Sequence, residues 1–360
     1  MAYITLYKHK LQHNYEFLRA LFAENGMKWG IVSKLLCGNE DYLRLLMSLG
    51  TDEVHDSRIS NLRKVKEINP QAYTVYIKPP ASEVVAEVVQ YADVSMNTEY
   101  YTLKLLSDEA QRQGKVHHAI IMIETGDLRE GVMGDNLVNF YAKVFELPHI
   151  KILGLGTNLN CLHGVLPSQD KLIQLSLYKQ IIELKFNREI PLVSGGTSVT
   201  IPLLLHKQVP KGVNHFRVGE TLFFGTNLFD DSLIPGMTND VFELFAQIIE
   251  ITKKPMTPSG DLGHNVAGEK TEIDPALFGQ SSFRAILDLG LLDIDPQYLI
   301  LDTDVHPFEV VGASSDMIVL DLGQNQAGFK VGDFIPFQLK YMGALSLMNS
   351  NYVEKKVEEG

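Results

Sequence analysis

Cysteine is scarce in this sequence of 360 residues, which contains only Cys37 and Cys161. Two thiols form neither the disulfide framework of a small secreted protein nor the ligand spacing of a zinc site. No apolar run reaches the ~18 residues that a membrane-spanning helix needs, and the first residues lack the apolar core of a signal peptide. These absences predict a cytoplasmic protein with reduced thiols, no bound metal and no membrane partner.

Positive charge is also in short supply. The chain has 32 Lys and Arg residues against 44 Asp and Glu residues, and its net charge is −12. Proteins that bind nucleic acid neutralise phosphates with basic patches, and no basic stripe is present here, so a nucleic-acid partner is not expected. The apolar fraction of 45% is typical of a globular enzyme, and the length suits a large domain with a smaller one.

Short β-rich runs alternate with amphipathic helical stretches through the first two thirds of the chain. Eight such runs predict a parallel (β/α)8 barrel, with a doubly wound open sheet as the alternative. The last unit is the weakest, because no clear closing helix follows its strand. The runs cover residues 29–34, 51–57, 72–78, 91–97, 117–125, 150–158, 190–196 and 215–220.

The pattern changes after about residue 230, where turn-rich segments separate runs of alternating apolar and polar residues. "RAILDLG", "EVVGASSDMIVLDLG" and "VGDFIPFQL" are typical of antiparallel strands. We therefore expect a barrel over residues 8–229 and a smaller, mainly antiparallel β-domain over residues 230–360.

Barrel enzymes carry their reactive groups at the carboxyl ends of the strands. Lys34 ends the first strand, and a lysine that reacts with a carbonyl must be held still and partly shielded from water. The other strand ends supply arginines, amides, hydroxyls and carboxylates, namely His55, Asp56, Ser57, Arg58, Asn97, Asp127, Arg129, Thr157, Asn158, Arg217 and Glu220.

The seventh strand opens into "SGGTS", which resembles a phosphate cradle, although a plain turn is the alternative. Glycines let the backbone approach an anion, while Ser194, Thr197 and Ser198 add hydroxyl donors. Gly219, at the next strand end, brings another N–H to the same region. A phosphate site beside a reactive lysine indicates pyridoxal 5′-phosphate, whose aldehyde forms a Schiff base with lysine.

A family resemblance covers nearly the whole chain, from about residue 29 to residue 353. The chain resembles the fold-type III pyridoxal-phosphate amino-acid racemases, which are alanine racemase-like, and among them most the ornithine racemase group. The matching stretches, in order, are "VSKLLCGN", "HDSRISNL", "MIETGDLREG", "GLGTNLNC", "VSGGTSVTIPLL", "FRVGETLFFG", "GASSDMIVLD" and "LMNSNYV".

The resemblance implies a role for each matching residue. Lys34 would be the Schiff-base lysine, and Arg217 would face the pyridine nitrogen, where a guanidinium cannot share its proton. Arg129 would contact the cofactor or the substrate carboxylate, with an ion pair to Asp127 or Glu130 as its alternative. Asn158 would lie over the cofactor ring. Phosphate contacts would come from Ser194, Gly195, Thr197 and Ser198, and through the backbone from Gly219 and Glu220.

Racemisation needs a second proton-transfer group opposite Lys34. The ornithine racemase pattern leads us to expect histidine after "SSD", but this sequence has Met317, which cannot transfer a proton. Asp316 and Tyr341 are the candidates that we carry forward. Tyr352 and His264 are weaker ones.

The resemblance also implies that an N-terminal strand over residues 1–7 joins the C-terminal β-domain before the chain enters the barrel. It further implies a homodimer in which each site borrows second-domain residues from its partner. The expected activity is racemisation of free alanine or of a basic amino acid such as ornithine or lysine, whose ammonium could meet Glu99, Asp127 or Glu130. A non-catalytic pyridoxal-phosphate carrier and another enzyme of this fold type, a lyase or decarboxylase, are the alternatives. Arg217 disfavours a decarboxylase, which should place a carboxylate at the pyridine nitrogen.

Overall fold

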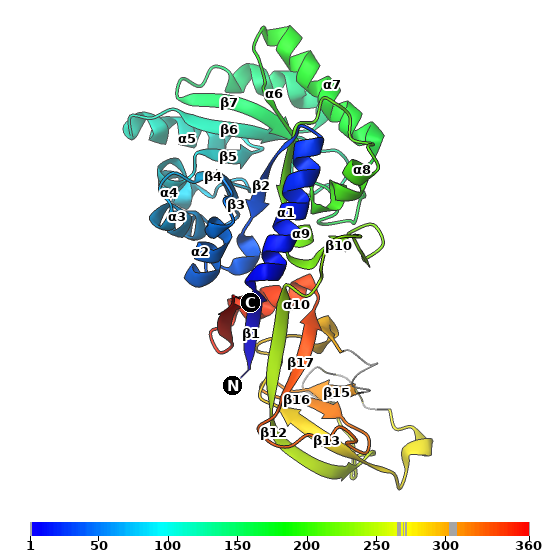
Figure 1. Ribbon diagram of the computed structural model, residues 1–360. Helices are drawn as coiled ribbons and strands as arrows, with labels where there is room; N and C mark the ends of the chain where they lie inside the picture. Colours follow the sequence, from blue (N-terminus) through cyan, green and yellow to red (C-terminus); the bar gives the residue numbers. More distant parts are fainter. Residues whose placement is uncertain (1, 265–267, 269, 271, 302–307, 360) are drawn as a thin grey trace. The chain divides into compact units, whose positions relative to one another are not determined.

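A computed structural model describes residues 2–264, 268, 270, 272–301 and 308–359. The chain forms two compact units (Figure 1). One contains residues 9–239, and the other combines the N-terminal segment up to Lys8 with the chain from Asp240 onward.

The first unit is a closed barrel of eight parallel strands, which confirms the predicted barrel and excludes the open sheet. Each strand pairs with its successor, and the last returns to the first. Each lies within or beside a run predicted from the sequence. The strands are β2 (Lys28–Val32), β3 (Glu53–Asp56), β4 (Tyr73–Tyr76), β5 (Val94–Asn97), β6 (His117–Met122), β7 (Ile150–Gly156), β8 (Leu192–Thr197) and β9 (His215–Val218).

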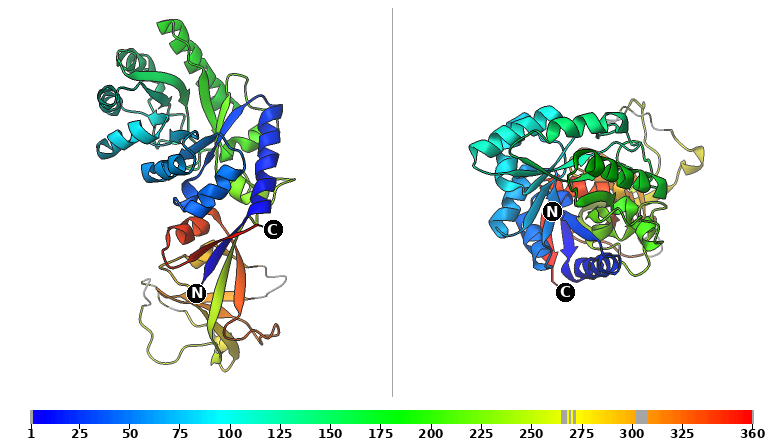
Figure 2. Two further views of the ribbon diagram at one scale, coloured as in Figure 1. Left: turned by 60° about the vertical axis from the view of Figure 1, so that its left-hand side comes forward. Right: turned by 90° about the horizontal axis from the view of Figure 1, so that it is seen from above.

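Helices surround these strands, as the view from above in Figure 2 shows. Their apolar faces pack on the sheet while their polar faces meet solvent. They are α2 (Glu40–Ser48), α3 (Ile59–Ile68), α4 (Val85–Tyr91), α5 (Tyr100–Arg112), α6 (Leu137–Val144), α7 (Gln169–Phe186), α8 (Ile201–Leu205) and α9 (Glu220–Phe224). Short 3₁₀ turns are η1 (Lys34–Leu36), η2 (Ser82–Val84), η3 (Gly134–Asn136) and η4 (Ser198–Thr200).

The seam between β9 and β2 is covered by the N-terminal helix α1 (Lys8–Glu24), because α9 has only five residues. The ring of Phe22 lies 5.2 Å from that of Trp29 in β2 and 5.1 Å from that of Phe216 in β9. The missing closing helix noted in the sequence is thus replaced by a helix from the other end of the barrel segment.

The second unit is a largely antiparallel sheet. Its longest strand, β12, buries alternate residues from Phe242 to Ile248. The strand order is β14 (Leu299–Ile300), β17 (Phe334–Leu339), β12 (Phe242–Pro255), β13 (Ser281–Leu287), β16 (Ile318–Asp321), β15 (Glu309–Ala313).

Strand β1 (Tyr3–Tyr7) adds to this sheet beside β12, antiparallel to it, and pairs in parallel with β18 (Glu354–Glu358). The remaining elements are the β10 (Thr226–Asn227) and β11 (Ser232–Leu233) hairpin, η5 (Pro275–Leu277), η6 (Pro296–Tyr298) and α10 (Tyr341–Asn349). Among the described residues, no helix combines the length and apolarity needed to cross a membrane.

Candidate active site

The barrel residues singled out in the sequence come from the carboxyl ends of parallel strands, and these ends meet on one side of a closed barrel. Lys34 follows β2, Asn158 follows β7, and the segment from Ser194 ends β8. Arg217 lies in β9, and Glu220 begins α9.

Arg217 is buried, with only 4% of its surface exposed. Its NH1 group donates to the Ser194 carbonyl oxygen at 2.9 Å and to the Ser194 hydroxyl at 2.5 Å, and its NH2 group donates to the Thr157 carbonyl at 2.7 Å. Burial lowers the pKa of Arg217 to about 10, so the group remains a cation at neutral pH. These contacts use three of its five N–H bonds and hold the guanidinium in a fixed orientation.

The "SGGTS" segment is tied to the start of α9 by one hydroxyl. Ser198 Oγ accepts hydrogen bonds from the backbone N–H groups of Gly219 and Thr221, both at 3.2 Å. The two strand ends named as a phosphate site are therefore in direct contact.

Of the two glycine positions in this segment, packing requires the first to be small and the second to be glycine. A Cβ atom on Gly196 would lie 2.0 Å from the Phe216 ring, and one on Gly195 would press against Leu175 and Val213 at 3.1 Å. The backbone at these positions therefore packs closely against side chains of the barrel wall and of the helix layer. The sequence had instead explained the glycines by the close approach of an anion.

Lys34 begins η1, directly after the buried Ser33 at the end of β2. Ser33 donates to the buried carboxylate of Asp56 at 2.8 Å and so connects the ends of β2 and β3. The Lys34 side chain is exposed in the single chain, so the shielding expected for it is not provided there. Burial raises the pKa of Glu220 to about 7, and the positive charge of Lys34 opposes this shift.

Asp127 anchors the loop after β7. Its buried carboxylate accepts backbone hydrogen bonds from Cys161 at 3.1 Å and Leu162 at 3.0 Å, and further ones from His163 and Val165. Burial raises its pKa, but these N–H groups outweigh burial and the pKa is lowered overall. Asn158 lies in the same loop and donates to Cys161 Sγ at 3.1 Å.

Arg129 is exposed and pairs with the neighbouring carboxylate of Glu130 through two N–H groups. This pair is the alternative that the sequence left open for it. Asn97, in contrast, is fully buried. Its amide donates to Ser95, while its Oδ1 has no hydrogen-bond partner among the described residues.

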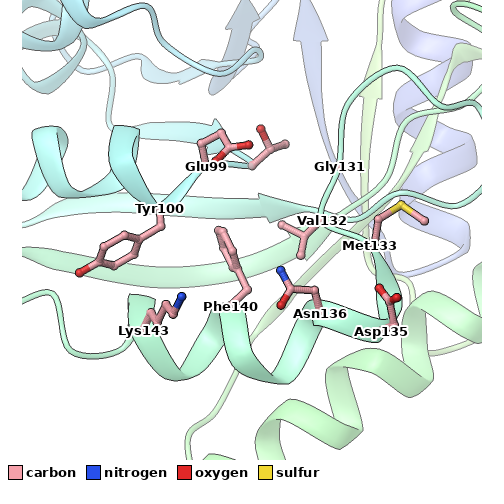
Figure 3. A pocket seen from close by; sticks show the side chains of 10 residues that line it. Glu99, Tyr100, Gly131, Val132, Met133, Asp135, Asn136, Phe140 and Lys143 are labelled. Atoms are coloured by element: carbon pink, nitrogen blue, oxygen red, sulfur yellow. The ribbon is translucent and has the colours of Figure 1, made fainter.

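A cavity of about 450 Å³ lies between the loops that follow β5 and β6 (Figure 3). Its lining does not include Lys34, Arg217 or the "SGGTS" segment. Phe140 and Lys143 project into it from α6, Asn136 projects from η3, and Glu99 enters from the loop after β5. Its remaining lining residues are Thr98, Tyr100, Gly131, Val132, Met133 and Asp135.

The candidates for the second proton-transfer group belong to the other unit. Asp316 is exposed in a turn and accepts a hydrogen bond from Ser315 at 2.7 Å. Tyr341 begins α10 and is partly buried, including its hydroxyl oxygen. Met317 and Tyr352 are exposed by 39% and 76%, and His264 is also exposed.

Two residues that the sequence reasoning missed connect to Arg217. Ser194 Oγ lies 2.7 Å from His215 Nδ1, and His215 Nε2 lies 2.9 Å from the Glu53 carboxylate. Both residues are the first of their strands and lie away from the carboxyl ends, where reactive groups were expected. The spacing of two between His215 and Arg217 was the available signal, because it puts both on one face of β9.

Residues 7–227 match the model of the family described as alanine racemase, N-terminal domain. The chain belongs to this family. Within it, the chain is 38% identical to the ornithine racemase of Acetoanaerobium sticklandii, over 98% of this chain and 99% of that protein. It is 31% identical to the lysine racemase of Thermotoga maritima, over 97% of this chain and 96% of that protein.

Solved structures of alanine racemases have the same fold at low identity. The enzyme of Clostridium difficile 630 matches with a TM-score of 0.73 and 15% identity, over 100% of this chain and 96% of that one. The Bartonella henselae alanine racemase, solved with covalently bound pyridoxal phosphate, matches with a TM-score of 0.73 and 14% identity, over 99% of each chain. These likenesses confirm the barrel and the second β-rich unit as the alanine racemase fold.

Proposed function

We propose that the protein is a pyridoxal 5′-phosphate-dependent amino-acid racemase that acts on a free basic amino acid, ornithine or lysine. The observation that carries the proposal is the full-length similarity to an ornithine racemase and to a lysine racemase. No feature favours a carrier protein, a lyase or a decarboxylase over this activity.

The residues present fit the cofactor. Among the residues that the structure describes, the buried Oδ1 of Asn97 has no hydrogen-bond partner, which marks a polar site inside the barrel, and the contacts of Arg217 leave N–H bonds for a ring nitrogen. Phosphate would be held at the junction of β8 and β9 by Gly195, Thr197 and Ser198, and by the backbone of Gly219 and Glu220. The hydroxyl of Ser194, which the sequence offered as a further phosphate donor, instead contacts Arg217 and His215. Asn158 would lie against the ring.

The cofactor, when bound, acts as an electron sink that acidifies the Cα–H bond of an attached amino acid. Lys34 would hold the cofactor and would serve as the base on one face of Cα. Arg217 would face the ring nitrogen as a donor that keeps its proton, which would suit simple proton exchange. Arg129 would receive the substrate carboxylate after leaving Glu130.

A group on the opposite face returns a proton to Cα, so that one proton leaves, one arrives and the configuration inverts. Asp316 and Tyr341 are our candidates for this group. Because both belong to the second unit, we propose a homodimer in which each site is completed by the partner chain. A cytoplasmic location stays a prediction from the sequence.

Exchange in deuterated water tests the activity. With L-ornithine or L-lysine, we expect the Cα proton signal and the optical rotation to be lost together. Lys34→Ala should abolish both, whereas Lys104→Ala, which changes an exposed lysine of α5, should keep both. Exchange with retained configuration would show that the second proton-transfer group is missing. A wild-type protein that exchanges no proton of ornithine, lysine or alanine would refute the proposal.

A further inference from the structure

The barrel interior contains a chain of hydrogen bonds from Arg217 to Glu53. Arg217 NH1 lies 2.5 Å from Ser194 Oγ, which lies 2.7 Å from His215 Nδ1, and His215 Nε2 lies 2.9 Å from Glu53 Oε1. Alternation along the strand puts Arg217 and His215 on the same inner face of β9. We call these four residues the relay.

The carboxylate of Glu53 also accepts a hydrogen bond from a second histidine, which belongs to the same strand as Glu53. His55 Nε2 lies 2.6 Å from the same oxygen, Oε1, and the two histidine rings stack 5.6 Å apart. His55 is fully buried, and its Nδ1 has no hydrogen-bond partner among the described residues. A charged His55 would bury an unpaired N–H, so the ring is neutral and carries its hydrogen on Nε2.

Gly30 of β2 makes room for this arrangement. A Cβ atom there would lie 2.3 Å from His55 Nε2 and 2.9 Å from Glu53 Cγ. Only glycine therefore allows His55 and Glu53 to meet between β2 and β9. A larger residue at position 30 would displace the Glu53 carboxylate, which is the hydrogen-bond acceptor of both histidines.

Glu53 determines the direction of every bond in the relay. Burial raises its pKa, but the hydrogen bonds from His215 and His55 outweigh burial, so the pKa is lowered and the group is a carboxylate. A carboxylate can only accept, so His215 donates through Nε2, and in the neutral ring Nδ1 is then an acceptor. The Ser194 hydroxyl then donates to His215 and accepts from Arg217.

We propose that Glu53 is a positioning residue, whose carboxylate sets the donor direction of the relay and so keeps the Arg217 guanidinium fixed and electrostatically compensated. The catalytic consequence rests on the proposed racemase function, while the donor direction does not. Without the carboxylate, His215 could carry its hydrogen on Nδ1 and donate to Ser194. The Ser194 hydroxyl hydrogen would then lose its acceptor, and Arg217 would lose its fixed partner.

The cluster of Glu53, His55 and His215 could instead bind a metal ion, because their possible ligand atoms lie close to one another. The separations of 2.6 Å and 2.9 Å between carboxylate oxygen and ring nitrogens are those of hydrogen bonds. Ligand atoms around a tetrahedral zinc ion lie roughly 3.3 Å apart, given metal–ligand distances near ~2.0 Å. The geometry therefore favours the relay.

Two substitutions separate the hydrogen-bond role of Glu53 from its charge. In Glu53→Met both histidines lose their acceptor. In Glu53→Gln the amide oxygen can still accept from both, while the charge is lost and an NH2 group replaces the second oxygen. We expect ¹⁵N-histidine NMR to show His215 with its hydrogen on Nε2 in the wild type and Glu53→Gln, and on Nδ1 in Glu53→Met. A His215→Gln variant assigns the signal.

Kinetics give the second readout. We expect kcat to fall about 10- to 100-fold in Glu53→Met, with KM nearly unchanged, which is the usual size for groups that orient a catalytic ligand. A smaller fall is expected in Glu53→Gln. Asp93→Asn is the matched control, since Asp93 also bridges strands by accepting from Thr74 N at 2.8 Å and Lys66 at 2.7 Å. Its kcat should be unchanged.

The outcomes are distinguishable. A His215 that keeps its Nε2 hydrogen in Glu53→Met overturns the proposal, as does a stoichiometric metal ion that Glu53→Gln releases. If Glu53→Met does not fold, a reduced kcat in Glu53→Gln supports the proposal, and a wild-type kcat there overturns it. If the wild-type protein racemises nothing, the proposed function fails, and the NMR result alone decides the relay.

Discussion

The ends of β9 and β6 each supply an arginine, but they hold it in opposite ways. Arg217 is buried and donates to Ser194 and to Thr157, which belong to two other strand ends. Arg129 is exposed, and its guanidinium pairs with the adjacent residue, Glu130. The barrel fixes the orientation of Arg217 before any ligand binds. The ion pair between Arg129 and Glu130 lies at the surface and can open when a ligand binds.

Substitution by lysine should separate these two arginines most strongly. Arg217→Lys keeps the charge but cannot make the divergent contacts to Ser194 and Thr157. We expect kcat to fall on the order of a hundredfold, as when a preorganised donor is removed from an active site. Racemisation followed by circular dichroism measures this effect, and the cofactor absorbance reports whether the cofactor is still bound.

Arg129→Lys is the matched comparison. The exposed ammonium can still meet Glu130 or a carboxylate, so we expect less than about a tenfold loss, mainly in KM, as for other exposed ion pairs. Equal losses in the two variants would remove the distinction between the β9 and β6 ends.

The junction of β8 and β9 gives a second contrast, this time in stability. Ser198→Ala leaves the N–H groups of Gly219 and Thr221 without their acceptor, which should cost about 1–3 kcal/mol of unfolding free energy. Urea denaturation of the apoprotein measures it. Ser60→Ala, in an exposed position of α3, should stay within about 0.5 kcal/mol of wild type. Equal stabilities would show that this hydroxyl does not hold the junction.

Glu220 should make the apoprotein less stable as pH rises. Its pKa is raised to about 7 in the folded chain, from 4.5. The stability is therefore fully present below about pH 4.5 and is lost as the carboxyl group ionises on approaching pH 7. We expect a decline of roughly 1–2 kcal/mol over this range, after discounting for partial exposure. Glu220→Gln should flatten this part of the stability profile, and an unchanged slope would contradict the assignment.

The strands of the barrel were predictable because each is a short apolar run ended by turn residues, as with "WGIVSK" and "HFRVGE". Barrel closure was harder to anticipate, since it depends on Phe22 of α1 reaching Trp29 and Phe216. Strand β12 was missed, although Phe242, Leu244, Ala246 and Ile248 alternate as a half-buried strand should.

The candidate site divides in the same manner. Lys34 and the "SGGTS" segment are local signals, because the residue type and its place after a strand carry the information. Glu53 and His215 carry no such signal, since their meeting depends on the packing of β3 against β2 and β9 and on the space left by Gly30. Exposure is equally non-local, and the exposed Lys34 side chain was not anticipated.

Substrate choice should show the smallest effect and gives the last contrast. Three carboxylates were candidates for the side-chain ammonium of ornithine. Asp127 is occupied by backbone N–H groups and Glu130 by Arg129, whereas Glu99 is exposed and lines the cavity after β5. We therefore propose Glu99 as the carboxylate that meets the ammonium of a basic substrate.

Glu99→Gln should raise KM for L-ornithine about three- to tenfold and leave KM for L-alanine unchanged, because an exposed ion pair contributes only about 1 kcal/mol. Initial rates with both amino acids, at low and high salt, measure this, since screening should weaken only the ornithine interaction. Asp135→Asn changes another carboxylate of the same cavity. It tests whether ornithine binding depends on the position of Glu99 or only on the negative charge of the cavity. An equal KM rise for both amino acids in Glu99→Gln would show that Glu99 does not recognise the ammonium, and the engaged carboxylates near β6 would then have to release their partners on binding.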